Sequence, residues 1–312
     1  MKKKIYSKIF NDLAAIRARN EAVAKNTADS AFSISEINEC DTAMRLNSFA
    51  LIKAEMENKD TAELKAKEEE LTAKLESLLN KYGYKSTDFE PVHSCSKCSD
   101  TGRIGNLFCS CFNTRYIDEV KRAANLEISA PFTFNDCDFS RISNENQKKF
   151  LEETYKKAKT YCKMFSTQKT QNMLLTGATG TGKTCVASAI ANELVNRGIT
   201  VIFVSAFELL QKMKECHFAL PEDRDLYLED YMSVDLLIID DLGVEQILRN
   251  ITCEYLLLIL CEREAHGKST IVTTNLGDKI LSRYGDRIAS RLTNQKNTLI
   301  RNFNGNDMRN QR

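Results

Sequence analysis

The chain has 312 residues, of which 42% are hydrophobic and 28% charged, and its formal net charge is +1. This length allows two domains, and the near balance of 44 basic and 43 acidic residues excludes a wholly basic nucleic-acid coat protein and an acidic tail protein. With 3 Pro and 12 Gly, the composition also argues against a disordered chain and against an all-β protein with many tight turns.

The sequence has no apolar run of the roughly 18–20 residues that a membrane-spanning helix needs. Its start, Met1 to Lys4, is basic like a signal peptide, but Asn11, Asp12 and Arg17 occupy the stretch where an apolar core should follow. We therefore expect a cytoplasmic protein with no membrane partner. In that compartment its 11 cysteines stay reduced, so clustered cysteines indicate metal ligands rather than disulfides.

Residues 1–90 have the pattern of a helical region, with apolar residues at helical spacing and a composition rich in Ala, Glu, Lys and Leu. Ser33 followed by Glu36 predicts a capping box at the start of one helix. Asp60 predicts the start of another helix, which ends near Gly83. This second helix belongs either to a small bundle or to a segment that binds a partner or itself, because its apolar stripe is shorter than three heptads.

Four cysteines follow in a short segment that interrupts the helical pattern. They form a Cys-x-x-Cys pair and a Cys-x-Cys pair: Cys95, Cys98, Cys109 and Cys111. Four thiolates at this spacing can surround Zn²⁺ as a tetrahedron, and such a closed site is structural because no coordination position stays open. An iron–sulfur cluster uses the same ligands, the adjacent His93 could replace one sulfur, and four unrelated reduced thiols are the plainest alternative.

The chain then continues through a linker into an α/β domain. We place the zinc-binding segment at 91–128, the linker at 129–144 and the second domain at 145–312. In that domain helical segments alternate with apolar strands, which predicts a central parallel sheet flanked by helices. The predicted strands are Asn172–Thr176, Thr200–Ser205, Leu236–Asp240 and Thr270–Thr274, and the helices between them include Lys183–Arg197 and Ile251–His266.

A complete P-loop, G-x-x-x-x-G-K-T, lies between the first of these strands and the helix that follows. Its residues are Gly177, Ala178, Thr179, Gly180, Thr181, Gly182, Lys183 and Thr184. Glycines let backbone N–H groups turn toward phosphates, and the helix N-terminus adds partial positive charge. We expect Lys183 to contact the β- and γ-phosphates and Thr184 to bind Mg²⁺, with Cys185 completing the set at the nucleotide.

Two later strands end in polar residues that belong with a P-loop. The apolar run Leu236–Ile239 leads into Asp240, which we expect to hold Mg²⁺, and Asp241, which we expect to orient the attacking water. The next strand ends in Asn275, whose amide would help to position that water. Taken alone, Asn275 would be an ordinary residue at a strand end. The set predicts ATP and Mg²⁺ as cofactors.

The stretch Asp278–Arg312 has eight basic and three acidic residues, a local balance of +5. Arg283, Arg287 and Arg291 are four residues apart and lie near one face if Leu281–Leu292 is helical. They form either a solvated basic face or a set from which one arginine reaches the nucleotide of a neighbouring subunit.

Together these motifs resemble the AAA+ ATPases of the DnaC/DnaI helicase-loader group, which is close to the IstB transposition ATPases. The resemblance is carried by GATGTGKT, LLIIDDLG, TTN and YGDRIASRL. The upstream CSKCSDTGRI and CSC are similar to the zinc-binding region of the DnaI-like loaders. The likeness extends from about residue 91 to the C-terminus, whereas residues 1–90 match only in length and helical character. It implies the AAA+ P-loop NTPase fold.

The resemblance also implies a role for each motif residue. These roles are Walker A for Gly182, Lys183 and Thr184, Walker B for Asp240 and Asp241, sensor 1 for Asn275, arginine finger for Arg291 with Arg287 in the same motif, and sensor 2 for Arg309. Most AAA+ proteins have Glu at the position of Asp241. The shorter carboxylate lies farther from the water, so we expect a slow ATPase, and the loader branch shares this Asp.

The family implies an ATP-dependent loader that binds a DnaB-type hexameric replicative helicase through residues 1–90 and places it on single-stranded DNA. Copies of the chain would associate through their ATP sites, with ATP binding as an assembly switch and hydrolysis as release. One alternative is an IstB-like ATPase that binds duplex DNA and recruits a transposase, against which the cysteine cluster argues. Another is a P-loop kinase or GTPase, but the sequence has no Asn-Lys-x-Asp motif.

Overall fold

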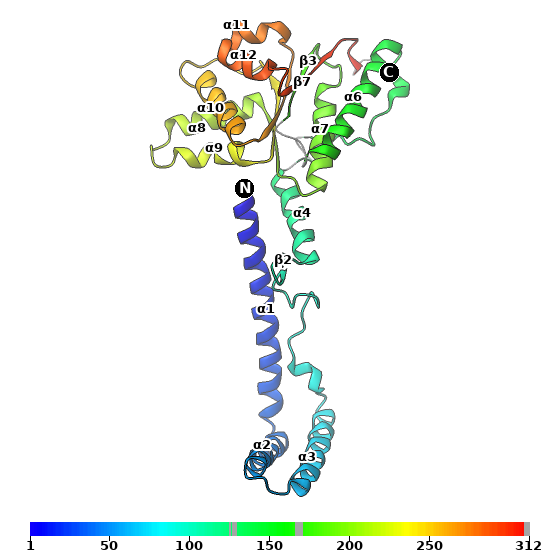
Figure 1. Ribbon diagram of the computed structural model, residues 1–312, viewed down its shortest axis with the longest axis vertical. Helices are drawn as coiled ribbons and strands as arrows, with labels where there is room; N and C mark the ends of the chain where they lie inside the picture. The colour runs from blue at the N-terminus through cyan, green and yellow to red at the C-terminus, as the bar shows by residue number, and fades with distance from the viewer. Residues whose placement is uncertain (125, 127–129, 166–170, 309–312) are drawn as a thin grey trace. The chain divides into compact units, whose positions relative to one another are not determined.

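The computed structural model describes residues 1–124, 126, 130–165 and 171–308, and its chain divides into two compact units (Figure 1). We call Ser7–Asn113 the helical unit, and Met1–Tyr6 together with Thr114–Arg312 the sheet unit. Helices α1 (Lys2–Phe32) and α4 (Ser110–Ala124) each contain residues of both units.

The helical unit consists of helices followed by a small hairpin. Helices α2 (Ser35–Met56) and α3 (Ala62–Lys81) pack against each other, and the 3-10 helix η1 (Ser86–Phe89) follows them. Ala31, Ile37 and Leu79 form a buried cluster that joins α1, α2 and α3. The antiparallel hairpin pairs β1 (Arg103–Ile104) with β2 (Leu107–Phe108).

The helical character of this region is confirmed, but one of its predicted caps is wrong. The Ser33 hydroxyl donates to the carbonyl oxygen of Ser30 (2.7 Å) in the last turn of α1, and the apolar Ile34 occupies the N-cap position of α2. At the start of α3, Asp60 Oδ1 accepts a hydrogen bond from the first backbone N–H (3.0 Å). Gly83, with a φ of +81°, follows the end of that helix as predicted.

A five-stranded parallel sheet forms the centre of the sheet unit, in the order β4-β5-β6-β3-β7. Its strands are β3 (Asn172–Gly177), β4 (Val201–Ser205), β5 (Leu236–Leu242), β6 (Ser269–Thr274) and β7 (Thr298–Phe303). Four of them lie where the sequence predicts strands. The sequence did not predict β7, because this edge strand is only partly buried and contains Arg301 and Asn302 in place of an apolar run.

Helices cover both faces of this sheet. They are α6 (Glu145–Met164), α7 (Lys183–Asn196), α8 (Ala206–Phe218), α9 (Arg224–Ser233), α10 (Thr252–Ala265), α11 (Ile280–Tyr284) and α12 (Asp286–Thr293), with the 3-10 helices η2 (Phe139–Arg141) and η3 (Gly277–Lys279). In Figure 1, α6 and α7 lie on one side of the sheet and α8, α10 and α12 on the other. Leu237 and Ile239, which alternate along β5, pack in the apolar cluster with α8, α10 and α12. The predicted parallel sheet flanked by helices is confirmed. Among the described residues, no helix has the length and apolar character to span a membrane.

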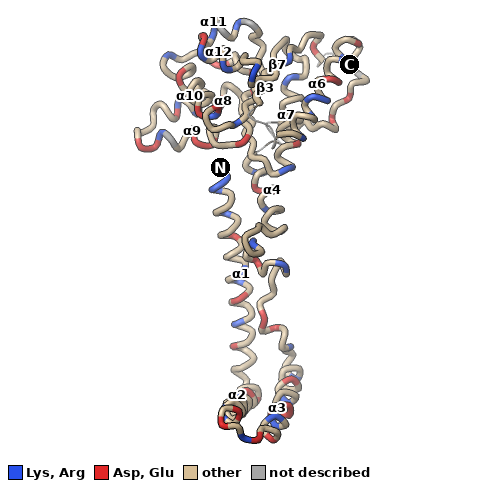
Figure 2. The backbone as a smooth tube through the Cα atoms, viewed as in Figure 1, with Lys and Arg blue, Asp and Glu red and all other residues tan. Residues whose placement is uncertain are grey.

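The arginine-rich stretch near the end of the chain is not one helix. Lys and Arg positions recur along α11 and α12 (Figure 2), but Gly285, with a φ of +80°, separates the two helices. Arg283 therefore lies on a different helix from Arg287 and Arg291, and the predicted single face is wrong. The Arg283 guanidinium instead donates to the carbonyl oxygen of Glu245.

A cluster of opposite charges surrounds Asp235, directly before β5. Its carboxylate accepts hydrogen bonds from Lys268 Nζ (2.9 Å) and Thr200 Oγ1 (2.8 Å), and Lys2 Nζ lies 2.7 Å away. Burial alone would raise the pKa of Asp235, but the contacts with Lys2, Lys268 and Thr200 outweigh it and lower the pKa to about 2. The charged carboxylate therefore stabilises the folded state above the ordinary pKa of 3.8, and this contribution is lost as the pH falls toward 2.

We expect Asp235→Asn to lower the free energy of unfolding by about 1–2 kcal/mol at pH 7, with a smaller difference near pH 2. The measurement is urea unfolding of both proteins at pH 7, 4 and 2.5. Glu222→Gln, which changes an exposed acid, serves as the control. A difference between Asp235→Asn and the wild type that stays constant from pH 7 to 2.5 would contradict the role of the charged carboxylate.

Candidate nucleotide and metal sites

The P-loop joins β3 to α7 at the carboxyl end of the sheet. Gly182 is the N-cap of α7 with a φ of +97°, a conformation that glycine adopts without strain. Lys183, the first residue of α7, is 4% exposed. Its Nζ donates to the carbonyl oxygens of Gly177 (2.9 Å) and Ala178 (2.7 Å) and to Asn275 Oδ1 (2.6 Å). The structure thus brings the P-loop lysine into contact with the residue that follows β6.

Thr184 and Asp240 form the second contact between the P-loop and the sheet. Thr184 Oγ1 donates to the two carboxylate oxygens of Asp240 (3.0 and 3.2 Å), and Thr273 Oγ1 donates to one of them (2.6 Å). Burial raises the pKa of Asp240, and the neighbouring Asp241 adds to this effect. A hydroxyl and a carboxylate at this position are the oxygen ligands that Mg²⁺ prefers, so the residues fit the predicted magnesium site.

A β-bulge explains how two consecutive acids both serve one site. Asp240 and Asp241 of β5 together stand opposite a single residue of β6, Thr273. Asp241 has a φ of +54°, and its backbone N–H donates to Thr273 Oγ1 (2.8 Å). In a regular strand neighbouring side chains point to opposite faces, whereas a bulge redirects one of them. Asp241 consequently lines the nucleotide cavity, while Asp240 contacts Thr184.

These groups surround a cavity of about 320 Å³, within the range of small-molecule sites. Its lining residues are Phe132, Thr179, Gly180, Gly182, Lys183, Thr184, Cys185, Asp241, Asn275 and Met308. The sequence did not single out Phe132 and Met308 as site residues, because Phe132 lies in the predicted linker and Met308 only precedes the predicted sensor 2 arginine. Phe132 is held by its backbone N–H, which donates to Ser188 Oγ on α7 (2.9 Å). The predicted Arg309 lies outside the described residues.

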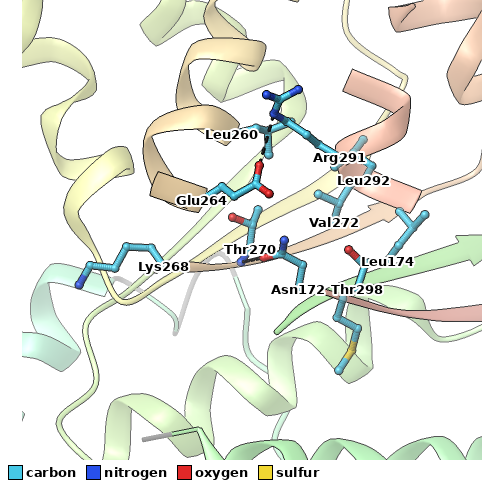
Figure 3. A pocket seen from close by; sticks show the side chains of 11 residues that line it. Asn172, Leu174, Leu260, Glu264, Lys268, Thr270, Val272, Arg291, Leu292 and Thr298 are labelled. Carbon is cyan, nitrogen blue, oxygen red and sulfur yellow. Dashed lines mark hydrogen bonds and ion pairs between the residues drawn. The ribbon is translucent and has the colours of Figure 1, made fainter. Parts of the chain in front are cut away.

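The two arginines of the predicted finger motif lie away from this cavity. Arg291 lines a narrow pocket beside Asn172 and Thr298, the first residues of β3 and β7, and therefore lies at the amino end of the sheet (Figure 3). Its Nε is 3.4 Å from Glu264 Oε2, and its Nη1 donates to the carbonyl oxygen of Arg287 (3.2 Å). The structure does not bring Arg291 or Arg287 to the P-loop of the same chain.

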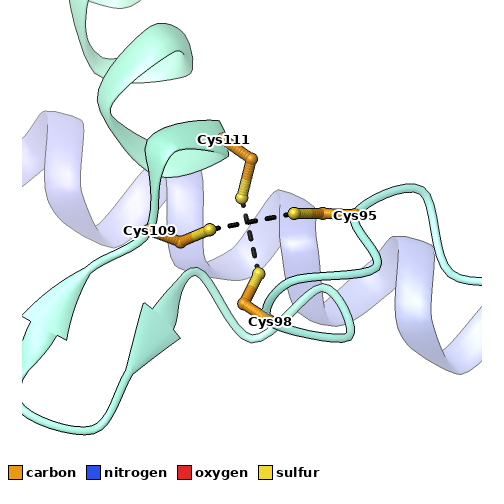
Figure 4. A group of neighbouring side chains, drawn as sticks. All are labelled: Cys95, Cys98, Cys109 and Cys111. Atoms are coloured by element: carbon orange, nitrogen blue, oxygen red, sulfur yellow. Dashed lines mark hydrogen bonds between the residues drawn. The ribbon is translucent and has the colours of Figure 1, made fainter.

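The four predicted metal ligands meet in the helical unit. The sulfur atoms of Cys95, Cys98, Cys109 and Cys111 lie within 4.8 Å of one another and point toward a common centre (Figure 4). The Sγ–Sγ distances are 3.7 Å between Cys95 and Cys109 and 3.5 Å between Cys98 and Cys111. Zn–S bonds of about 2.3 Å in a tetrahedron place the sulfur atoms about 3.8 Å apart. The arrangement therefore fits a zinc ion.

The buried Asp100 fixes the backbone at the first of these cysteines. Asp100 is 1% exposed, and its carboxylate accepts the backbone N–H groups of Ser94 (2.8 Å) and Cys95 (3.0 Å). His93 Nδ1 lies 3.6 Å from the same carboxylate, so His93 is a neighbour of Asp100 and not one of the four clustered ligands. Among these interacting thiols, a backbone hydrogen bond from Cys111 lowers the pKa of Cys109, while burial raises the pKa of Cys111.

Comparison with known proteins gives the chain a family. A family model described as "IstB-like ATP binding protein" matches residues 110–308. The replicative helicase loader DnaC of Buchnera aphidicola subsp. Acyrthosiphon pisum is 30% identical over 165 residues, which cover 51% of this chain and 64% of that protein. DnaC of Escherichia coli K12 is 32% identical over 112 residues, 35% of this chain and 44% of that one. The match spans less than two thirds of these relatives.

Two solved structures align with part of the chain. The crystal structure of the DnaC helicase loader aligns with a TM-score of 0.41 at 22% identity, over 47% of this chain and 86% of the other. The crystal structure of DnaI aligns with a TM-score of 0.40 at 21% identity, over 57% of this chain and 90% of the DnaI chain. The family match covers more than half of the chain and includes the P-loop, Asp240, Asp241 and Asn275. Of the four clustered cysteines, only Cys111 lies inside it. The chain belongs to the IstB-like ATP-binding protein family.

Proposed function

We propose that the protein is a cytoplasmic, ATP-dependent loader that binds a DnaB-type hexameric replicative helicase and delivers it to single-stranded DNA at replication initiation. The observation that carries this proposal is the joined site of Lys183, Thr184, Asp240, Asp241 and Asn275 in a chain whose relatives include replicative helicase loaders. The matched segment covers only part of those relatives. Binding to the helicase, binding to DNA and delivery of the helicase to DNA therefore each need an experiment.

The site supports slow hydrolysis of ATP to ADP and phosphate. Lys183 exchanges its contacts with P-loop carbonyl oxygens for contacts with the β- and γ-phosphates, while Thr184 and Asp240 hold Mg²⁺. Asp241 orients the attacking water from the cavity wall, and Asn275 positions it from the end of β6. A short aspartate side chain reaches less far than glutamate, which is the reason for expecting a low rate.

The position of Arg291 favours an ATPase site that is formed by two copies of the chain. Its position at the amino end of the sheet, with the P-loop at the carboxyl end, prevents it from serving its own nucleotide. Arg291 of one copy would instead reach the nucleotide bound to a neighbouring copy and stabilise the charge of the transferring phosphoryl group there. Arg287, on the same helix, would support it. In this proposal ATP binding assembles the copies, and hydrolysis releases them.

We expect Arg291→Ala to reduce the ATPase rate by roughly three orders of magnitude, the lower end of the range for an arginine finger. ATP affinity should change little, because Arg291 does not line the nucleotide cavity. Steady-state phosphate release and equilibrium titration with a fluorescent ATP analogue measure the two effects. Lys296→Ala, an exposed change close by, serves as the control. An unchanged ATPase rate in Arg291→Ala would contradict the finger role.

The first 90 residues offer a surface for the helicase. Four large apolar residues of α2 recur every three or four positions and are 58–81% exposed: Leu46, Phe49, Ile52 and Met56. Exposed apolar side chains along one helix are typical of a protein-binding surface. This row supports the assignment of residues 1–90 to helicase binding.

The test combines a purified DnaB-type helicase hexamer with the full chain. With MgATP we expect the two to elute together in gel filtration, and the helicase to gain unwinding activity on a circular single-stranded substrate. Phe49→Glu should lose the complex while keeping its affinity for ATP. If the wild-type chain neither binds the helicase nor increases its unwinding, the loader function is contradicted.

The family match itself favours a second candidate, a transposition helper that binds duplex DNA. The IstB-like model covers the ATPase segment but begins at residue 110, so most of the cysteine cluster lies outside it. The two functions differ in the DNA that ATP enables the protein to hold. ATP-dependent binding to duplex DNA, with no effect of a helicase hexamer, supports the helper function, whereas helicase-dependent retention on single strands supports the loader.

A further inference from the structure

The run of residues that precedes the predicted sensor 2 arginine contributes a wall of the nucleotide cavity. We call it the C-terminal strap, Phe303–Met308, which continues from the end of β7. The backbone N–H of Met308 donates to the carbonyl oxygen of Gly180 (2.9 Å), and the Met308 side chain lines the cavity. A Cβ atom on Gly182 would lie 2.8 Å from Met308 Cε. The strap is therefore packed directly on the loop whose N–H groups would bind phosphate.

Gln147 holds the strap from the side of α6. Its side chain is buried, with 4% of the residue exposed. Nε2 donates to the carbonyl oxygen of Asn306 (3.0 Å), and Oε1 accepts the backbone N–H of the same residue (3.1 Å). The backbone approaches this amide closely at Gly305, where a Cβ atom would lie 2.3 Å from Gln147 Cδ. One side-chain amide thus satisfies both the donor and the acceptor of a strap residue.

The base of this clamp is itself fixed. Asn144, the N-cap of α6, accepts the backbone N–H groups of Asn146 (3.0 Å) and Gln147 (3.1 Å) through its Oδ1. One turn later on the same helix, Leu151 Cδ2 lies 3.6 Å from the position of a Cβ on Gly182. Helix α6 therefore supports the P-loop both through Leu151 and through the strap that Gln147 holds.

We propose that Gln147 is a positioning residue of the nucleotide site, which clamps the strap and thereby holds the P-loop in the shape that binds ATP. Glutamine suits this task because its amide both donates and accepts, whereas a carboxylate only accepts and an aliphatic side chain does neither. We expect the effect on binding more than on the chemical step, because Asp307 and Met308 of the strap pack directly on Gly180 and Gly182 of the P-loop. The proposal rests on the proposed function only in taking ATP as the ligand.

The test compares Gln147→Ala with Asn146→Ala, a change of the exposed residue one position earlier, in the full chain. Titration with a fluorescent ATP analogue in the presence of Mg²⁺ should show about tenfold weaker binding by Gln147→Ala, the loss expected for one or two hydrogen bonds. Asn146→Ala should bind like the wild type. In steady state, KM should rise by the same factor while kcat stays within about twofold. If Gln147 only stabilised the fold, Gln147→Ala would lower the melting temperature but would not raise KM selectively while kcat stays constant.

Gln147→Glu adds a readout that does not depend on how well the alanine variant folds. At pH 8 its carboxylate faces the Asn306 carbonyl oxygen, and binding relative to the wild type should be weak. Burial raises the pKa of a carboxyl group, so at pH 5.5 the protonated form can donate to that oxygen and the ratio should return toward one. Wild-type affinity in Gln147→Ala, or an equal loss in Gln147→Glu at both pH values, would overturn the clamp. Absence of ATP binding by the wild-type chain would instead contradict the proposed function.

Discussion

Lys183→Ala is expected to weaken ATP binding by about 100-fold while the chain stays folded. Two charge-assisted hydrogen bonds to phosphate oxygens are worth about 3 kcal/mol together, which corresponds to this factor. The Lys183 ammonium is already in place, between the carbonyl oxygens of the P-loop and the amide oxygen of Asn275. Binding therefore requires only a local exchange of its partners, and the measurement is equilibrium titration with a fluorescent ATP analogue.

The matched control for this variant is Lys212→Ala, which removes a half-exposed lysine on α8 that pairs with Glu215. It should bind ATP like the wild type, and both variants should keep the circular dichroism spectrum of the unchanged protein. Tight ATP binding by Lys183→Ala would show that the P-loop does not hold the nucleotide.

Removal of the metal is expected to unfold the segment that contains the four cysteines. The strands of the hairpin have two residues each, all of them exposed, and Leu107 is 76% exposed. Apart from the cysteines, the apolar core of the segment is Phe112, which packs on Phe10 and Phe108. A structural zinc site supplies about 10 kcal/mol or more of binding free energy, which is then available for folding. We expect about one zinc per chain, and rapid amide hydrogen exchange of residues 93–112 after chelation or in Cys98→Ser.

Cys261→Ser, which changes a cysteine outside the cluster, should retain both the zinc and the slow exchange. Because iron–sulfur clusters use the same four ligands, the metal is measured by elemental analysis together with visible absorption. A chain that contains no metal and still protects residues 93–112 from exchange would refute the structural zinc site. Stoichiometric iron with visible absorption would assign the cysteines to an iron–sulfur cluster.

The chemistry of the nucleotide site could be predicted because its motifs are contiguous in sequence. Each motif follows an apolar segment that predicts a strand. These motifs are the P-loop, the pair Asp240 and Asp241, and Asn275. The topology then brings these ends together, since β3 lies beside β6 and β6 beside β5. Parallel strands place their carboxyl ends on one edge, so the order of motifs along the chain sufficed to predict their contact.

The parts that were not predicted depend on backbone geometry without a compositional signal. Asp240 and Asp241 serve one site only because of a bulge in β5. The sequence does not reveal that Asp241 has a positive φ. The clamp of Gln147 on Asn306 joins residues 159 positions apart, and no sequence pattern connects the two. The break at Gly285 went unrecognised because arginines on both sides kept the spacing of a continuous helix.

In the proposed function, Arg291 of one copy completes the nucleotide site of another. Lys183→Ala binds ATP about 100-fold more weakly but keeps Arg291, whereas Arg291→Ala keeps the P-loop but lacks the finger, so the mixture is assayed at an ATP concentration that leaves the Lys183→Ala site largely empty. In an equal mixture, about a quarter of the head-to-tail interfaces combine an intact P-loop with an intact finger. We predict that the mixture hydrolyses ATP well above the sum of the two separate variants. A rate equal to that sum, at concentrations where the wild type is active, would contradict the account.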